Sequence, residues 1–424
     1  MILLNITLRF PLGKAYLTKK QKKIASKLVS LFKKKINIDY NSNDNIKLNI
    51  KNFGTESNLN NIINNIKDLN INLNKINQST TEANYYLDLD YNLLIIGNGF
   101  DIAHNLKTTY IDFLNTYSKS TNSHKYDIKN NCIYLYLKEQ KNQNGYWTDV
   151  EQSITNIIKF LEKIKITFKD NTSYEAKDFK NLLGESYLNF IHILCPLKYD
   201  KHNLIYTFTN NYFNESVRKL EYDLDSFINA LEDYLLKIEN TPINKPIHLN
   251  DISNIKDSIT HILSFNYTDT FRKLYINDIS DKNIDFIHGR LGKHNLVLGI
   301  SETLNNEQEN LELSCIYFKK YFQRIFKKTG AKYADWLSNK SGYEFSTVYI
   351  YGHSLDITDK EILSRIINDV NHVKKIVIFY HNETHYRQEI SNLVKILDKN
   401  TFLKYVAEHR IEFKEQTNLQ ISKS

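Results

Sequence analysis

The chain has 424 residues, of which 41% are apolar and 12% aromatic, with only 12 glycines and 4 prolines. It is long enough to bury a sizeable core, and this composition excludes a disordered or low-complexity protein. The net charge of +8 comes from 56 basic and 48 acidic residues spread along the chain, so nucleic-acid binding is not favoured.

Residues 1–88 are predicted to form a small α+β N-terminal module of unknown role. Residues 2–9 and 45–53 alternate apolar and polar side chains, as strands do, whereas residues 19–34 and 58–78 place apolar side chains at helical spacing. Polar residues interrupt the first ten positions too often for a signal peptide, and no later run approaches the roughly 18 apolar residues of a membrane span.

From residue 89 onward, apolar runs alternate with helical patterns, which indicates a parallel sheet covered by helices. We therefore predict a Rossmann-like α/β domain over residues 89–424, with a mainly parallel sheet and flanking helices. A large helical insertion is expected at about residues 113–258, where apolar residues recur at three-four spacing. The expected strands are 92–96, 261–265, 283–287, 296–300, 347–351 and 375–380, and the expected helices of the insertion are 147–161, 174–194 and 214–238.

The first of these strands leads directly into Gly97-Asn98-Gly99, with Asp101 close behind. Two glycines allow a sharp turn and a close backbone approach to a ligand. If the amides at the start of the following helix point outward, they can bind a phosphate or pyrophosphate. The common dinucleotide fingerprint would need a third glycine at Ile102, so a plain tight turn stays open as the alternative.

Three further predicted strands end in polar residues, and the carboxyl ends of parallel strands lie at one edge of a sheet. Ligands of open α/β sheets bind at this edge, so we expect these residues to share one site with the glycine turn. The alternative is that the Asn and Asp residues cap helices and that the histidines are structural. The polar residues are Asn266 and Asp269, then His288, then Gly352, His353 and Ser354.

Five segments, in this order, resemble the conserved blocks of the AbiH family of bacteriophage abortive infection proteins. The resemblance covers about residues 91–385 and leaves the N-terminal module outside, because the family's glycine block usually lies near the start of the chain. It implies a role in phage defence, in which an infected bacterium stops growing or dies before the phage spreads. The segments are GNGFDIAHNLKTTYIDFL from Gly97, WTDVE at 147–151, SFNYTDT at 264–270, IHG at 287–289 and YGHSLDITDKEIL at 351–363.

The same segments are similar, more distantly, to the sirtuin-like NADase domains of other defence systems. That resemblance implies NAD as substrate or ligand and catalytic roles for Asn266 and His288. Two positions depart from the pattern, since Asp269 lies three residues after Asn266 instead of two and Asp101 replaces a small residue. The implied cofactor-binding residues are Gly97, Asn98, Gly99 and Asp101 along the cofactor, Gly352 and Ser354 at the adenosine ribose or phosphates, and their neighbours Asp269 and His353.

The residue types suit this chemistry. Cleavage of the nicotinamide–ribose bond passes through an oxocarbenium-like state, and the leaving group departs neutral, so no general acid is required. An amide such as Asn266 can position the ribose or a water, and His288 can accept a proton. A pair of catalytic carboxylates is therefore not expected.

Three hypotheses follow from the sequence. The first is an NAD glycohydrolase that depletes NAD in the infected cell, and the second is a nucleotide sensor that binds NAD or ADP-ribose without cleaving it. The third, a nucleic-acid-directed toxin acting through the basic lysines of the N-terminal module, is the least favoured. An unknown phage-derived trigger and self-assembly into a homo-oligomer are expected partners of the first two.

Cysteine and histidine spacing predicts no metal site. Cys132, Cys195 and Cys315 lie far apart, which is typical of buried thiols in a reducing compartment, and we expect a cytoplasmic protein. His381 and His385 are four residues apart, but the Glu does not directly follow the first His, as zinc proteases require.

Overall fold

The structure is a computed structural model. It describes residues 2–9, 36–40, 45–53, 73–78 and 82–87, and most of residues 91–417. Within 91–417 the residues not described are 120–125, 127, 147–148, 170–171, 176, 179–180, 182–193, 196, 201–204, 243–245, 276–278, 301–313 and 339–343.

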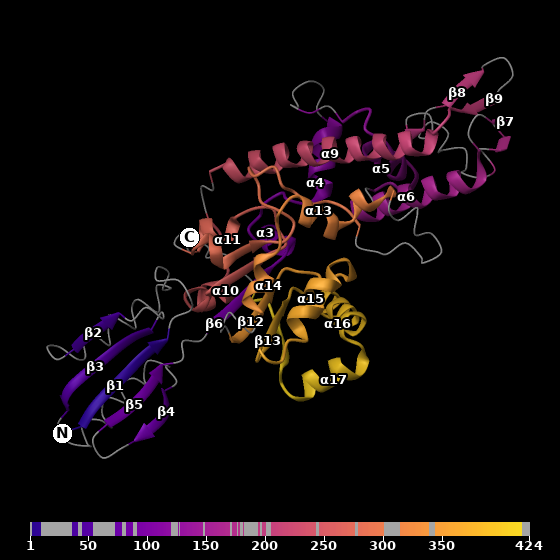
Figure 1. Cartoon of the computed structure of the whole chain (residues 1–424). Helices are drawn as coiled ribbons and strands as arrows, with labels where there is room; N and C mark the ends of the chain where they lie inside the picture. The colour runs from indigo at the N-terminus through magenta and orange to yellow at the C-terminus, as the bar shows by residue number, and fades with distance from the viewer. Residues whose placement is uncertain are drawn as a thin grey trace.

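The centre of the molecule is a six-stranded sheet in which every pair of neighbouring strands is parallel (Figure 1). Side chains alternate between its two faces, and both faces are covered, so Leu93 to Ile96 are all nearly inaccessible. The predicted α/β class with a parallel sheet is confirmed. The strands are β6 (Tyr91–Ile96), β10 (His261–Ser264), β11 (Ile284–Phe286), β12 (Phe345–Tyr351), β13 (Ile376–Tyr380) and β14 (Ile411–Glu415).

The strand order is β11-β10-β6-β12-β13-β14. The chain therefore starts at the middle strand β6, adds two strands on one side, and then crosses over to add three on the other. This is the doubly wound order of Rossmann folds, and it creates a switch point between β6 and β12. Ligands of such sheets bind outside the carboxyl ends of the strands beside the switch point.

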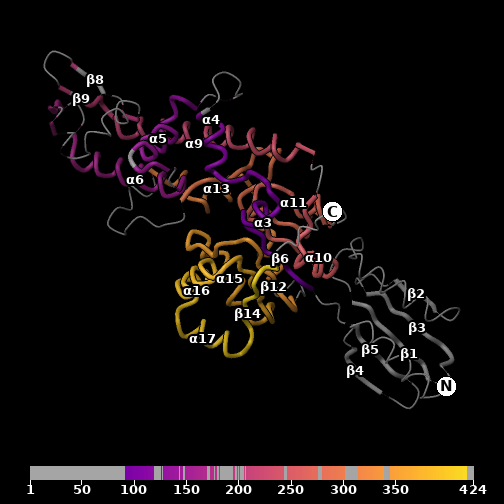
Figure 2. Tube along the Cα trace, turned by 180° about the vertical axis from the view of Figure 1, so that it is seen from behind, coloured from indigo at the N-terminus to yellow at the C-terminus, as the bar shows by residue number. Residues whose placement is uncertain are grey.

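Helices cover the sheet on both faces (Figures 1 and 2). Leu93 and Ile95 share a core with residues of α14 to α17, whereas Leu94 and Ile96 pack with residues of α3, α10 and α11. The two layers are α14 (Lys332–Trp336), α15 (Lys360–Ile367), α16 (Glu383–Leu397) and α17 (Lys399–Ala407) on one face, and α3 (Asn98–Ala103), α10 (Asn250–Ile255) and α11 (Thr270–Leu274) on the other. Short 3-10 turns are η2 (Lys256–Ser258), η3 (Asp281–Asn283), η5 (Ile316–Phe318) and η6 (Ile357–Asp359).

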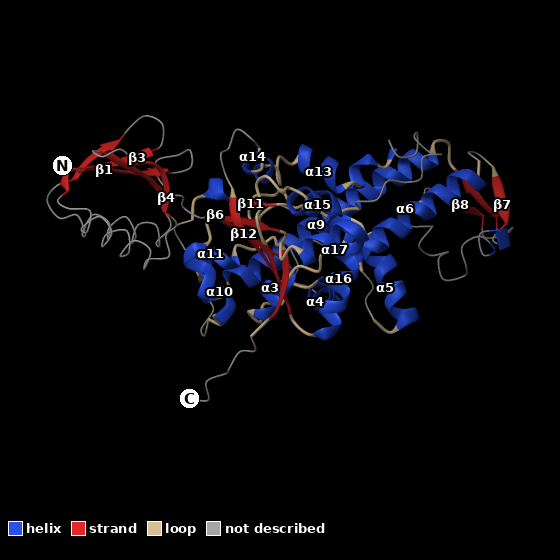
Figure 3. Ribbon diagram, turned by 90° about the horizontal axis from the view of Figure 1, so that it is seen from below, coloured by secondary structure: helices blue, strands red, loops and turns tan. Residues whose placement is uncertain are grey.

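The segment between β6 and β10 forms helices with a hydrophobic core of their own, and Figure 3 shows them extending beyond the sheet towards three short strands. The predicted helix 214–238 is confirmed. The predicted helix 174–194 is wrong at its start, because Ser173–Glu175 pairs as a strand with residues 205–207, and residues 182–193 lie outside the described residues. The elements are α4 (Tyr110–Lys119), α5 (Cys132–Asn144), α6 (Val150–Thr167), α9 (Tyr212–Asn240), β7 (Ser173–Glu175), β8 (Leu197–Asp200) and β9 (Ile205–Phe208), joined later in the chain by α13 (Lys320–Phe326).

Two details of the predicted sheet are wrong. Residues 296–300 form no strand of the sheet: Leu296, Leu298 and Ile300 are buried in the insertion's core, and only Ile300 makes a bridge, to Lys319. Strand β14 was not predicted, because its residues are partly exposed at the sheet edge and carry a weak apolar signal.

The N-terminal strands form a separate sheet in the order β2-β3-β1-β5-β4. Strands at 2–9 and 45–53 were predicted and are confirmed. The end of the predicted helix 58–78 is wrong, since residues 73–78 pair antiparallel with β5, while 19–34 and 58–72 lie outside the described residues. The strands are β1 (Ile2–Arg9), β2 (Ile36–Tyr40), β3 (Asn45–Phe53), β4 (Leu73–Gln78) and β5 (Glu82–Leu87).

Candidate functional site

A pocket of about 720 Å³ opens at the carboxyl ends of β6, β10 and β12, at the switch point of the sheet. Its other side is closed by the insertion, through Glu151 of α6 and Leu231 and Leu235 of α9. This is the size and location expected of a small-molecule site in such a fold. Nine of the ten predicted site residues line it, namely Gly97, Asn98, Gly99, Asp101, Asn266, His288, Gly352, His353 and Ser354.

The two glycine turns of the site lock onto each other, and we call Gly97, Gly99 and Gly352 the glycine lock. The Gly97 and Gly99 amides donate to the carbonyl oxygens of Tyr351 and Gly352, at 3.2 and 2.8 Å. A Cβ on Gly99 would lie 2.8 Å from Gly352 backbone atoms. These two amides therefore do not point outward to a phosphate, and the smallness of both glycines instead lets the ends of β6 and β12 touch.

Asp101 follows the glycine lock on α3 and is buried at 1% exposure. Thr268 donates a hydrogen bond of 2.5 Å to its Oδ2, whereas its Oδ1 has no hydrogen-bonding partner. Burial raises the pKa of this carboxyl to about 6, although hydrogen bonding by the Thr268, Thr270 and Asn266 side chains acts to lower it. Asp101 therefore lines the pocket with a carboxyl whose pKa is raised towards neutrality and which has the Asn266 side chain as a polar neighbour beside the threonines.

Asn266 begins the loop after β10, and its backbone is held in place by Ser264. The Asn266 amide donates to Ser264 Oγ, which in turn donates to the Asn266 carbonyl, both at 3.1 Å. Its side chain is 5% exposed, yet neither Oδ1 nor Nδ2 has a hydrogen bond. A buried polar atom left unpaired costs about 1–3 kcal/mol, so the site holds this side chain ready for a ligand at the expense of stability.

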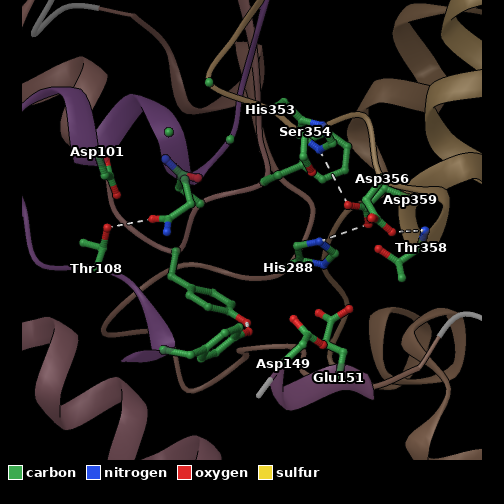
Figure 4. A pocket seen from close by; sticks show the side chains of 18 of the residues that line it. Asp101, Thr108, Asp149, Glu151, His288, His353, Ser354, Asp356, Thr358 and Asp359 are labelled. Carbon is green, nitrogen blue, oxygen red and sulfur yellow. Dashed lines mark hydrogen bonds and ion pairs between the residues drawn. The ribbon is translucent and has the colours of Figure 1, made fainter. Parts of the chain in front are cut away.

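Two histidines face one carboxylate on the side of the pocket formed by β11 and η6 (Figure 4). His288 Nε2 lies 3.3 Å from Asp359 Oδ1, and His353 Nε2 lies 3.6 Å from Asp359 Oδ2. His353 Nδ1 accepts the Leu355 amide at 2.9 Å, which places the proton of neutral His353 on Nε2. His288 Nδ1 is buried without a partner. Burial lowers the pKa of His288 to about 4, so the ring is neutral at pH 7.

A buried lysine joins this carboxylate to the insertion. The Nζ atom of Lys320, on α13, lies 2.8 Å from Glu151 Oε2 and 3.6 Å from Asp359 Oδ1. Burial acts to lower the pKa of Lys320, but both carboxylates outweigh it and the pKa is raised. Burial likewise would raise the pKa of Asp359, yet Lys320 and the histidines hold it well below its usual range. We call Glu151, His288, Lys320, His353 and Asp359 the ionic cluster.

The ionic cluster was missed at the level of sequence. Glu151 lies in the first turn of α6, but the residue that caps this helix is Asp149, which accepts the Gln152 amide, and Glu151 contacts Lys320. Burial raises the pKa of Glu151 to about 7 despite Lys320. Glu151 and Asp359 lie inside the motifs at 147–151 and 351–363, so the sequence could have indicated both as candidate site residues. Lys320 lies in none.

Asp269 is the one predicted site residue that lies outside the pocket. Its carboxylate contacts Arg290 at 2.8 Å and Arg272 at 3.3 Å, and its amide donates to Glu239. Asp269 is the residue that precedes α11, and its side chain contacts these two arginines. Its predicted contact with a cofactor is not supported by this position.

The part of the chain that forms the pocket matches a known family. The model of the family described as "Bacteriophage abortive infection AbiH" matches residues 93–381. The chain belongs to the AbiH family. Every described residue that lines the pocket lies within the matched range, so the pocket is part of the AbiH domain, and this member is a phage-defence protein. The N-terminal sheet lies outside the match.

The chain is also similar to part of a much longer protein. Over 190 residues it is 26% identical to "Reticulocyte-binding protein homolog 1" of Plasmodium falciparum (isolate 3D7). The aligned part covers 41% of the chain and 6% of that protein. The chain therefore spans only a small part of the length of this relative.

Two further searches of the described residues bear on ligands and location. Among them, no helix is both long and apolar enough to cross a membrane. The described His, Cys, Asp and Glu side chains form no group of three or more that could hold a metal ion. The rings of His381 and His385 lie 5.8 Å apart, without a third ligand among the described residues.

Proposed function

We propose that this AbiH protein binds NAD in the switch-point pocket and hydrolyses the bond between nicotinamide and ribose, which depletes NAD in the infected cell. Three observations support the proposal. The sheet has the strand order of dinucleotide-binding folds, the pocket has a volume of about 720 Å³, and it brings Asn266 and His288 together with the glycine lock.

The proposed reaction is NAD⁺ plus water giving nicotinamide, ADP-ribose and a proton. The bond from C1′ to the nicotinamide nitrogen breaks, and its electron pair leaves with nicotinamide. The oxygen of a water then bonds to C1′, and His288 Nδ1 accepts the proton that this water loses. The side chain of Asn266 has one donor group, Nδ2, and one acceptor, Oδ1, with which to hold the ribose hydroxyls or the water.

The observation that carries the proposal is the set of unpaired polar atoms at the pocket. Asn266 Oδ1 and Nδ2, His288 Nδ1 and Asp101 Oδ1 are all buried, and none makes a hydrogen bond of good geometry, although the Asn266 side chain lies close enough to Asp101 to lower the pKa of that carboxyl. Such atoms are rare in folded proteins because each destabilises the fold. Four of them around one cavity indicate a ligand with several hydroxyl or amide groups, such as a nucleoside.

The test is nicotinamide release from NAD by the purified full-length protein, with Asn266→Ala and His288→Ala beside the wild type. We expect each variant to lose about 100-fold or more in kcat, which is typical for a positioning amide or a general base. The control Asp257→Asn changes an exposed residue that does not line the pocket and retains the wild-type rate. Cellular NAD during phage infection, compared between wild type and His288→Ala, extends the test to the defence role.

One observation favours a second candidate, a nucleotide sensor without turnover. The pKa of His288, about 4, makes this imidazole a weak base, and weak bases accelerate proton transfer little. Calorimetry separates the two candidates. Binding of NAD or ADP-ribose by wild type without any nicotinamide release, also in extracts of infected cells, supports the sensor and refutes the hydrolase.

A further inference from the structure

The charged side chains that line the pocket are mostly acidic. Among the described lining residues there are five carboxylates, Asp101, Asp149, Glu151, Asp356 and Asp359, and a single lysine, Lys320. The two histidines at the pocket add no fixed charge when neutral. The electrostatic environment is therefore unfavourable for an anion, although the dinucleotide of the proposed function carries two phosphate charges.

The groups that commonly bind phosphate are already engaged in this part of the chain. Lys320 contacts two carboxylates, and its side chain is only 4% exposed. The Gly97 and Gly99 amides donate to Tyr351 and Gly352. A pyrophosphate inside the described pocket would meet carboxylates without an uncommitted cation among the described lining residues, so we expect it to lie outside the pocket.

The acidic side chains gather at one end of the pocket. In Figure 4, Asp149, Glu151, Asp356 and Asp359 lie on the side of His288, whereas Asp101 and Thr108 lie across the cavity. Asp149 and Asp356 are exposed, and each uses its Oδ1 to cap a helical turn, by accepting the amides of Gln152 and Thr358. We call these two residues the acidic rim.

Resting on the proposed function, we infer that the pocket recognises the cationic nicotinamide–ribose half of the substrate, with the acidic rim facing the nicotinamide cation and the unpaired atoms of Asn266 and Asp101 on the ribose. A positive charge persists on the ribose in the oxocarbenium-like state, so carboxylates at this end stabilise both the substrate and the transition state. Nicotinamide leaves neutral and loses that attraction, which favours its release. Nicotinamide riboside, which lacks phosphate, then suffices as a substrate.

The reaction of the smaller substrate balances in the same way. Nicotinamide riboside and water give nicotinamide, ribose and a proton, with the C1′–N electron pair leaving on nicotinamide. The purified full-length protein is tested with nicotinamide riboside, nicotinamide mononucleotide and NAD, and nicotinamide release is measured. We expect kcat/KM for nicotinamide riboside to lie within about tenfold of that for NAD, because the phosphates contribute little binding.

A binding experiment tests the role of charge separately from turnover. Calorimetry with the His288→Ala protein compares nicotinamide riboside with its neutral 1,4-dihydro form. We expect the cation to bind about tenfold or more tightly, and Asp149→Asn combined with Asp356→Asn to reduce that preference below about threefold. Asn retains the acceptor oxygen of both caps, so the helices remain. Asp257→Asn, the exposed control, keeps the full preference.

The outcomes separate this inference from the proposed function. NAD cleavage without cleavage or binding of nicotinamide riboside overturns the inference and leaves the hydrolase standing. Charge-selective binding without cleavage of any of the three compounds supports the inference and refutes hydrolysis. Equal affinity for the cation and its dihydro form, or a preference that survives loss of the acidic rim, also overturns the inference.

Discussion

The two sides of the pocket are built by different physical means. The glycine lock joins the ends of β6 and β12 through backbone contacts so close that no side chain fits between them. The ionic cluster instead holds the insertion to the sheet through buried charges, with Lys320 between Glu151 and Asp359. The glycine lock depends on the absence of side chains, and the ionic cluster depends on the balance of its buried charges. They should therefore respond differently to substitution and to pH.

The largest expected effect is on the glycine lock. A Cβ at Gly352 would lie 2.2 Å from the backbone nitrogen of Phe100, and φ there is +66°. Gly352→Ala should therefore lower the free energy of unfolding by about 4 kcal/mol or more, through steric overlap and backbone strain together. Urea unfolding measures this loss.

Gly145 provides a matched control for the backbone term. It ends α5 with φ of +80°, but a Cβ there would meet nothing within 4 Å. Gly145→Ala should lower stability by about 1 kcal/mol, from strain alone. Equal losses in the two variants would mean that the close approach of β6 and β12 contributes nothing.

The next effect is on the ionic cluster. Lys320→Met removes the cation that compensates Glu151 and Asp359, and a buried pair broken in this way typically costs about 3–5 kcal/mol. The loss should be larger at pH 8 than at pH 5, because Glu151, whose pKa is about 7, accepts a proton at the lower pH and becomes neutral. Lys374→Met, which removes an exposed pair with Glu344, should cost less than about 1 kcal/mol at either pH. A pH-independent loss for Lys320→Met would show that packing, not charge, holds the cluster.

The contrast also explains what could be predicted from the sequence. The first turn of the glycine lock can be predicted from local sequence, because an apolar strand followed directly by Gly97-Asn98-Gly99 indicates a tight turn. Strands β6, β10, β11, β12 and β13 likewise follow from short apolar runs that both sheet faces cover. The α/β class and the gathering of Asn266, His288 and Gly352 at one edge follow from these strands.

The ionic cluster could not be predicted in the same way. Its contacts depend on how α6 and α13 pack against the sheet, and this packing is decided by the tertiary core of the insertion. Leu296 to Ile300 shows the same limit, since its apolar run is buried in that core instead of in the sheet. An apolar run indicates burial, but not which partner buries it.

A smaller effect concerns the charge that lies beside the glycine lock. The pKa of Asp101 is about 6 in the folded protein, above the ordinary 3.8, so the folded state holds its proton more tightly. Its contribution to stability is therefore full below about pH 4 and is lost as pH rises through about 6. Asp101→Asn, which keeps an acceptor for Thr268, should become more stable relative to wild type by about 1–3 kcal/mol between pH 4 and pH 8. Urea unfolding across this range measures it, and a relative stability that does not change with pH would place the Asp101 carboxylate in a solvated environment.

The smallest effect is expected at Asp269, and it tests the boundary of the pocket. Asp269→Asn weakens contacts with Arg272 and Arg290, both partly exposed, so stability should fall by only about 1 kcal/mol. Binding of NAD, measured by calorimetry, should change less than about twofold, since the carboxylate faces the arginines and does not line the pocket. A tenfold loss of NAD affinity in a protein that unfolds normally would show that Asp269 reaches the ligand. The loop after Asn266 would then have to turn inward on binding, and Asp269 would become part of the pocket lining.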